Sequence, residues 1–167
     1  LEQTKIFLRK GDEDFDIDPV SSSKEALDRL KTEEYDIIVS DYQMPGIDGL
    51  EFLKIIREDM KSDIPFIIFT GKGREEVAIE ALNLGANRYI RKGGDPKSQY
   101  TLLSREIKRE VKLHLSDKQL KKNEKELKTI LENMSLPILI VDGEGKINRS
   151  NTATGEFVDK NKDKIID

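Results

Sequence analysis

The chain has 167 residues, of which 36% are hydrophobic and 37% are charged. Its formal net charge of -4 argues against a general nucleic-acid-binding protein, and the absence of cysteine excludes disulfides and thiolate zinc sites. No apolar run approaches the roughly 20 residues of a membrane-spanning helix, so we expect no membrane insertion. These properties favour a cytoplasmic α/β domain that carries an additional exposed helix.

Strands and helices alternate through the first part of the chain. A helix over 1–10 is stopped by Gly11, and the alternating segment FDIDPV predicts a short strand at 15–20. Further on, we expect helices at 21–34, 49–61 and 75–85, and strands at 36–40, 65–70 and 88–92. This alternation predicts βαβ units and therefore a parallel sheet.

A much longer helix is expected from Asp95-Pro96, which is typical of an N-cap and first helical residue, to about Met134. Four apolar residues fall seven apart along it: Leu113, Leu120, Leu127 and Met134. The companion row is mixed: Asp117 and Glu124 are charged and Leu131 is apolar. Two interpretations remain open, a homodimer seam within the 96–134 helix or a solvated linker helix with incidental leucines.

After Met134 the pattern changes again. The segment SLPILIVDGEGKINRSN predicts a strand, a turn at 142–145 and a second strand. A lone hairpin is marginal in water, so we expect this tail to be a fragment of a second domain. The chain begins at Leu1 inside a predicted helix, and we expect both ends to be cut from a longer protein.

Polar side chains follow three of the predicted strands: Asp41, Thr70 and Lys92. In an open parallel sheet, ligands bind outside the carboxyl ends of the strands, where these groups would meet. The carboxylate could be a metal ligand or a nucleophile, and the hydroxyl and ammonium could each bind a phosphoryl oxygen. Each of these residues alone is more often a helix cap or a solvated side chain. The hypothesis of a phosphoryl-binding site therefore rests on all three occurring together at the strand ends.

The motifs SDYQMPGIDG, FTG and YIRKGG, in this order, closely resemble the receiver domain of two-component response regulators. The resemblance implies a CheY-like, flavodoxin-like doubly wound parallel sheet. It implies that Asp41 is the phosphoacceptor for a histidine kinase, and that Thr70 and Lys92 bind the phosphoryl group. Tyr89 matches the aromatic residue that turns inward on activation.

The same resemblance implies a Mg²⁺ site, with Asp41 and the main-chain carbonyl of Gln43 as ligands. Gln43 and Lys72 match positions that tune the lifetime of the phosphate. Receivers begin with a strand that ends in an acidic metal-binding pair, and both are missing here. The acidic run 12–14 precedes a predicted strand and would lie at the wrong edge, so we expect weak or no Mg²⁺ binding. Without the first strand, the sheet would be open unless another segment or chain fills the gap.

The tail LENMSLPILIVDGEGKINRSN resembles the start of a PAS domain, a sensory module. We therefore expect a receiver domain at 1–112, a linker helix at 113–133 and a PAS fragment at 134–167. Receiver, linker and PAS domains are combined in this way in histidine kinases of methanogenic archaea, among other signalling proteins.

Several other functions fit less well. GKGRE after a strand lacks the GK[ST] ending of a P-loop, and a haloacid-dehalogenase-like site needs a second Asp where this chain has Gln43. His114 lacks the sequence context of a phosphoacceptor histidine, and no kinase ATP-binding motif occurs, which leaves only the parent protein as a candidate hybrid kinase. Two hypotheses remain: a phosphoacceptor switch that signals through the helix to a PAS domain, which we favour, and a non-switching receiver-like dimerisation module.

Overall fold

The computed structural model describes residues 2–11, 15–71, 74–144 and 146–160. They form two compact units, Leu1–Leu115 and Ser116–Asp167, with the long helix α5 (Pro96–Asn133) contributing to both. No helix in the described ranges is long and apolar enough to cross a membrane.

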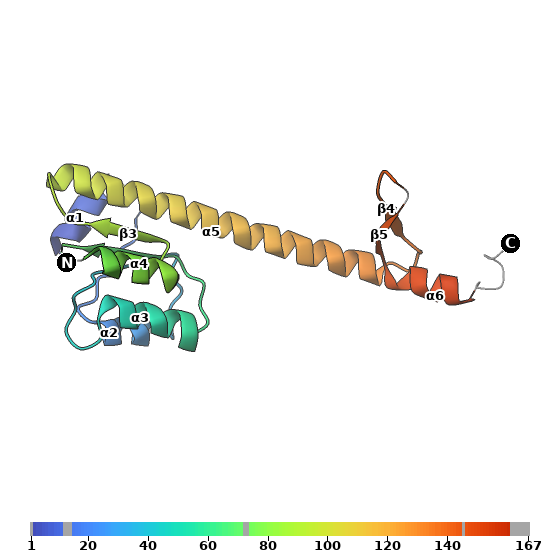
Figure 1. The fold of residues 1–167 in the computed structure, drawn as a ribbon, viewed down its shortest axis with the longest axis horizontal. Coiled ribbons are helices and arrows are strands. Elements are labelled where there is room, and N and C mark those ends of the chain that lie inside the picture. Colours follow the sequence, from blue (N-terminus) through green and yellow to red (C-terminus); the bar gives the residue numbers. More distant parts are fainter. Residues whose placement is uncertain (1, 12–14, 72–73, 145, 161–167) are drawn as a thin grey trace. The chain divides into compact units, whose positions relative to one another are not determined.

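A parallel sheet of three strands lies at the centre of the first unit (Figure 1). Its strands are β1 (Ile38–Ser40), β2 (Phe66–Thr70) and β3 (Arg88–Arg91), in the order β1-β2-β3. Val39 pairs with Ile67, and Ile68 pairs with Tyr89. The shared direction brings the carboxyl ends of all three strands to one edge, as the alternating sequence predicted.

Helices flank this sheet in chain order: α1 (Glu2–Gly11), α2 (Ser23–Arg29), α3 (Gly49–Lys54) with a π-helical turn (Ile55–Asp59), α4 (Glu75–Asn83) and the first part of α5. Side-chain caps fix two of their starts. The Ser22 hydroxyl accepts the Glu25 N–H, and Asp48 forms a reciprocal capping box with Glu51. Gly85, at φ +93°, lies just after the C-terminus of α4, where a left-handed residue ends many helices.

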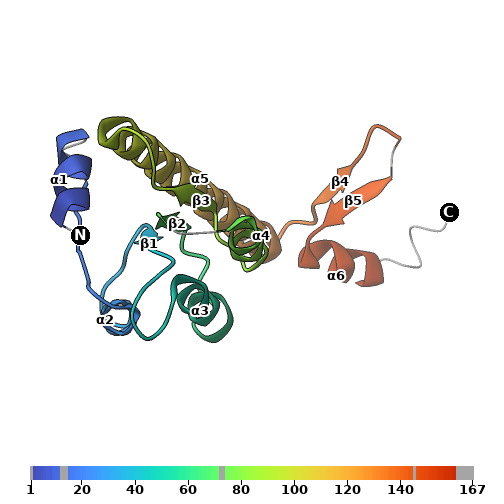
Figure 2. The same cartoon turned by 60° about the vertical axis from the view of Figure 1, so that its left-hand side comes forward.

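Both faces of the sheet are covered, which is the doubly wound arrangement. Successive side chains of β2 point to opposite faces, so Phe66 and Ile68 join a core with α2, α3 and α4. Ile67 and Phe69 join a second core with α1 and α5, through Leu8, Leu103 and Ile107. Figure 2 shows α1 and α5 on one side of the strands and α2 and α3 on the other.

The predicted strand at 15–20 is wrong, because these residues have no regular secondary structure. In the flavodoxin-like strand order 2-1-3-4-5, β1 to β3 take the last three places. The segment at 15–20 would be the second strand, whose only neighbour is the first. The described residues contain no strand before Ile38, so this segment has no ladder to join. The helix expected at 21–34 is also shorter, since α2 ends at Arg29.

The second unit contains the end of α5, the antiparallel hairpin β4 (Leu139–Val141) and β5 (Ile147–Ser150), and α6 (Thr152–Lys160). This confirms the predicted hairpin. Buried Asn151 holds the unit together through its side-chain amide. Its Nδ2 donates to the carbonyls of Leu131, Met134 and Leu136, and its Oδ1 accepts from Ile138 and Thr154. These bonds tie the end of α5 and the segment that follows it to the residue that precedes α6.

Candidate functional site

The carboxyl edge of the sheet brings together the three residues that the sequence singled out. Asp41 follows β1, Thr70 ends β2 and Lys92 follows β3. The Lys92 Nζ lies 2.6 Å from Asp41 Oδ2, and the main-chain N–H of Lys92 donates to the Thr70 carbonyl at 2.7 Å. The Thr70 side chain lies near enough to the Asp41 carboxylate to lower its pKa. A carboxylate, a hydroxyl and an ammonium therefore form one directly connected cluster.

The Asp41 carboxylate is held in its ionised form. Partial burial raises its pKa, but the hydrogen bond from Lys92, the nearby Thr70 side chain, the Lys92 charge and the Gln43 N–H outweigh burial, so the pKa lies below its ordinary value. Lys92 is also positioned by the Phe69 ring, whose centroid is 5.1 Å from Nζ. An ionised, partly exposed carboxylate is the state in which it can act as a nucleophile.

The loop after Asp41 owes its shape to a glycine. A Cβ at Gly49 would lie 2.4 Å from the Asp41 carbonyl oxygen, so no larger residue fits without moving the backbone. The Gly49 N–H donates to the Tyr42 carbonyl at 2.8 Å, which closes the loop. Ser40 Oγ donates to the same Asp41 carbonyl at 2.9 Å. The start of α3 is thereby fastened directly to the candidate phosphoacceptor.

Three further residues were predicted for the site, namely Gln43, Tyr89 and Lys72, and they are not all found beside Asp41. The main-chain N–H of Gln43 donates to Asp41 Oδ1 at 3.3 Å, whereas its side chain is exposed. Tyr89 packs against the α2–α3–α4 core, its hydroxyl is buried without a hydrogen-bond partner among the described residues, and burial raises its pKa. Lys72 lies outside the described residues.

Comparison with known proteins identifies the family. The model of the response regulator receiver domain matches residues 1–103. The chain belongs to this family. The response regulator SaeR of Staphylococcus epidermidis is 39% identical over 85 residues, which cover 51% of this chain and 36% of that protein. The chain spans less than half the length of the curated relatives it matches.

Solved receiver domains confirm the fold. The receiver domain of Francisella response regulator 1452 superimposes with a TM-score of 0.58 at 29% identity, over 68% of this chain and 90% of that one. The signal receiver domain of a histidine kinase from Syntrophus aciditrophicus gives 0.55 at 25% identity, over 66% and 80%. The flavodoxin-like, CheY-like fold with a long C-terminal helix is therefore confirmed.

The residues described for this receiver do not fit a Mg²⁺ site. Nowhere in the described ranges do three or more histidine, cysteine, aspartate or glutamate residues cluster as metal ligands. Asp41 supplies one carboxylate, and the Gln43 carbonyl would add a single further oxygen. The acidic run 12–14 lies outside the described residues. A hard divalent cation prefers about six oxygen ligands, so this set is too small.

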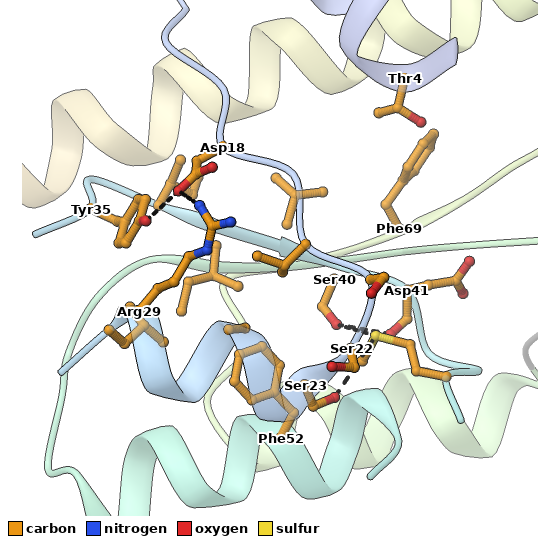
Figure 3. Close-up of a pocket in the computed structure, with 18 of the residues that line it drawn as sticks. Thr4, Asp18, Ser22, Ser23, Arg29, Tyr35, Ser40, Asp41, Phe52 and Phe69 are labelled. Carbon is orange, nitrogen blue, oxygen red and sulfur yellow. Dashed lines mark hydrogen bonds and ion pairs between the residues drawn. The ribbon is translucent and has the colours of Figure 1, made fainter. Parts of the chain in front are cut away.

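A cavity of about 370 Å³ lies beside β1, the edge strand of the receiver sheet (Figure 3). One end reaches Ser40 and Asp41, and the other is lined by Asp18, Arg29 and Tyr35. Arg29 pairs with Asp18, and the Tyr35 hydroxyl donates to Asp18 at 2.6 Å, which raises the pKa of Tyr35. Sequence reasoning missed this cluster because its members lie on three separate segments with no shared motif.

Proposed function

We propose that this receiver is a phosphoacceptor switch in which Asp41 takes a phosphoryl group from a phosphohistidine of a histidine kinase. The direct contact of Asp41 with Lys92 at 2.6 Å carries this proposal. Membership of the receiver family supports it. Thr70 completes the cluster from the neighbouring strand.

In the transfer, an Asp41 carboxylate oxygen attacks phosphorus, a P–O bond forms and the P–N bond of the phosphohistidine breaks. The low pKa of Asp41 keeps the attacking carboxylate ionised. Lys92, which hydrogen-bonds to the carboxylate, and Thr70, which ends the neighbouring strand, would then donate to the oxygens of the transferred group. Their preformed position lowers the reorganisation needed when negative charge accumulates there. No step in this scheme uses Mg²⁺.

The phosphorylated state would differ from the unmodified one near Thr70. Movement of its hydroxyl toward the phosphoryl group would open space at the sheet edge beside Tyr89. The Tyr89 side chain would then turn inward into that space. Gln43 and Lys72 would set how fast water removes the phosphate. The helix that begins at Pro96 would carry the change onward.

We also propose the domain plan expected from the sequence, with a receiver at 1–112, a linker at 113–133 and a PAS fragment at 134–167. The antiparallel hairpin followed by α6 supports a second folding unit. A receiver of a histidine kinase is among the similar structures, which favours a parent protein of that kind. The proposal that this parent belongs to the methanogenic archaea rests on the sequence resemblance alone.

A second candidate function is a dimerisation module that does not switch. It is favoured by the large apolar side chains that α5 leaves exposed, among them Leu113, Leu120 and Leu127. In this case the 96–134 helix would hold a homodimer whatever the state of Asp41. The two candidates differ in whether Asp41 reacts.

Intact mass spectrometry of the full chain before and after acetyl phosphate, with and without Mg²⁺, tests the first candidate. We expect a gain of one phosphoryl group that Asp41→Asn abolishes. Asp48→Asn is the matched control, because it removes a carboxylate from the same loop and keeps a good helix cap. It should still be phosphorylated. No gain under either condition, or a gain that survives Asp41→Asn, would reject Asp41 as the phosphoacceptor.

A further inference from the structure

The second half of α5 carries an apolar row that no described residue covers. Leu120, Leu127 and Ile130 are 59%, 53% and 60% exposed. They lie on one side of the helix, because residues three, seven and ten apart fall on the same face. Exposed apolar side chains that recur along one face of a solvated helix indicate a docking surface.

Two rows of residues flank these leucines on the helix surface, and the structure indicates which of them can share an interface with the leucines. One neighbouring row contains Asp117, Glu124 and Leu131. Leu131 is half-buried and lines a cavity of about 230 Å³ formed with the hairpin of its own chain, and its carbonyl accepts from Asn151. The apolar member of that row is therefore already used within the second unit.

The other neighbouring row, three residues after each leucine, contains Ser116, Asn123 and Ile130. All three are exposed and uncharged, so they can enter an interface without an unpaired charge. Gln119 Nε2 donates to Asn123 Oδ1 at 2.7 Å, which orients the Asn123 amide with its Nδ2 as a donor. An asparagine in the core of a coiled coil favours the register in which it meets a polar partner.

We propose that residues 113–133 pair with the same segment of a second copy as a parallel, in-register, two-stranded coiled coil. The a positions are Leu113, Leu120 and Leu127, and the d positions are Ser116, Asn123 and Ile130. In this register Asn123 faces the second copy's Asn123. The proposal gives the homodimer of the second candidate function its face and direction, and it does not depend on the chemistry of Asp41.

The flanking charges favour the parallel direction. A parallel pair brings Lys112 toward the second copy's Asp117, and Gln119 toward the second copy's Glu124, so one contact is attractive and the other neutral. An antiparallel pair centred on Asn123 would instead place Glu124 beside the second copy's Glu124. Two polar core positions, Ser116 and Asn123, lower the stability of the pair, so we expect a dimer that dissociates on dilution.

Single cysteines test the direction, because the chain contains no cysteine. Leu120→Cys and Leu127→Cys, each in the full chain, should both form interchain disulfides under mild oxidation. Parallel a positions face each other within the disulfide range of Cα separations, about 4.4–6.8 Å. Leu115→Cys, on another face of α5, is the matched control and should remain largely reduced. An antiparallel pair can bring at most one of the two test positions together, so cross-linking of one variant or neither overturns the proposal.

Analytical ultracentrifugation gives an independent readout. Leu127→Lys should weaken self-association at least tenfold, and Leu115→Lys should not, while Asn123→Leu should strengthen it. Circular dichroism of the same variants checks that α5 remains helical. Equal effects of the two lysine substitutions, or a wild-type chain that stays monomeric, would contradict the proposed seam. Phosphorylation of these variants, measured by mass, separates failure of the seam from failure of Asp41 chemistry.

Discussion

The strands β2 and β4 are both short and apolar, yet β2 is buried along its whole length and β4 is exposed along its whole length. β2 has a hydrogen-bonded neighbour on each side and a helical layer on each face. β4 pairs only with β5 among the described residues. An apolar run thus makes burial favourable, but the layers that pack on the strand decide whether burial happens.

The largest difference between these strands should appear in the free energy of unfolding when one of their side chains is truncated to alanine. We expect Ile68→Ala in β2 to lower the free energy of unfolding by about 3–4 kcal/mol, because it removes a fully buried side chain and leaves a cavity. Ile140→Ala in β4 should cost less than about 0.5 kcal/mol. Urea unfolding of both variants measures the contrast. A comparable loss at Ile140 would show that another surface covers β4 in solution.

Ion pairs show the same contrast between a buried and an exposed interaction, with an expected change in stability of intermediate size. In the first unit Arg88 lies 3.1 Å from Glu106 and 2.7 Å from Glu110, two carboxylates that are 8% and 5% exposed. Arg88→Met would leave these buried charges without their main partner, so we expect a loss of about 2–3 kcal/mol. Thermal and urea unfolding should both report it.

The matched control is Lys122→Met in the second unit. The Lys122–Glu126 pair is exposed and 3.9 Å apart, so its loss should change stability by less than about 0.5 kcal/mol. Equal effects of the two methionine substitutions would mean that Arg105 and Arg109, which also approach Glu106, already compensate its charge.

The smallest expected effect concerns two carboxylates whose pKa values are both lowered. Lys92→Met should raise the pKa of Asp41, because burial then acts with less opposition. Thr152→Ala should move the pKa of exposed Glu132 only back toward its ordinary value, since the Thr152 hydroxyl bond is the main cause of its lowering. NMR titration of the two carboxyl groups distinguishes these outcomes. A fall in either pKa would contradict the assigned causes.

The sign of the pH effect follows from the Asp41 shift. Because the folded pKa lies below the ordinary value of 3.8, the ion pair stabilises the fold above that pH. This contribution is lost as pH falls through the folded pKa. Lys92→Met should therefore cost about 0.5–1 kcal/mol at neutral pH, after allowance for solvent screening, and almost nothing in acid. A loss that does not change with pH would indicate lost packing on Phe69.

Local patterns in the sequence predicted most of the regular elements. The alternation of strand and helix patterns predicted the three parallel strands and the helices between them, and the structure confirms these elements. The strand at 15–20 failed, because alternation shows only that a segment suits a sheet. A strand also needs a neighbour with unpaired backbone groups, and the described residues contain no such neighbour for this segment.

For the candidate site, the sequence by itself determined the residue types at the ends of three strands: Asp41, Thr70 and Lys92. Such positions follow from where each predicted strand stops, which is local information. Only the tertiary structure decided that Lys92 reaches Asp41, that Gly49 must lack a side chain and that Asn151 binds the end of α5. Those contacts join residues 8 to 51 positions apart, and their distances depend on how the layers pack rather than on any one segment.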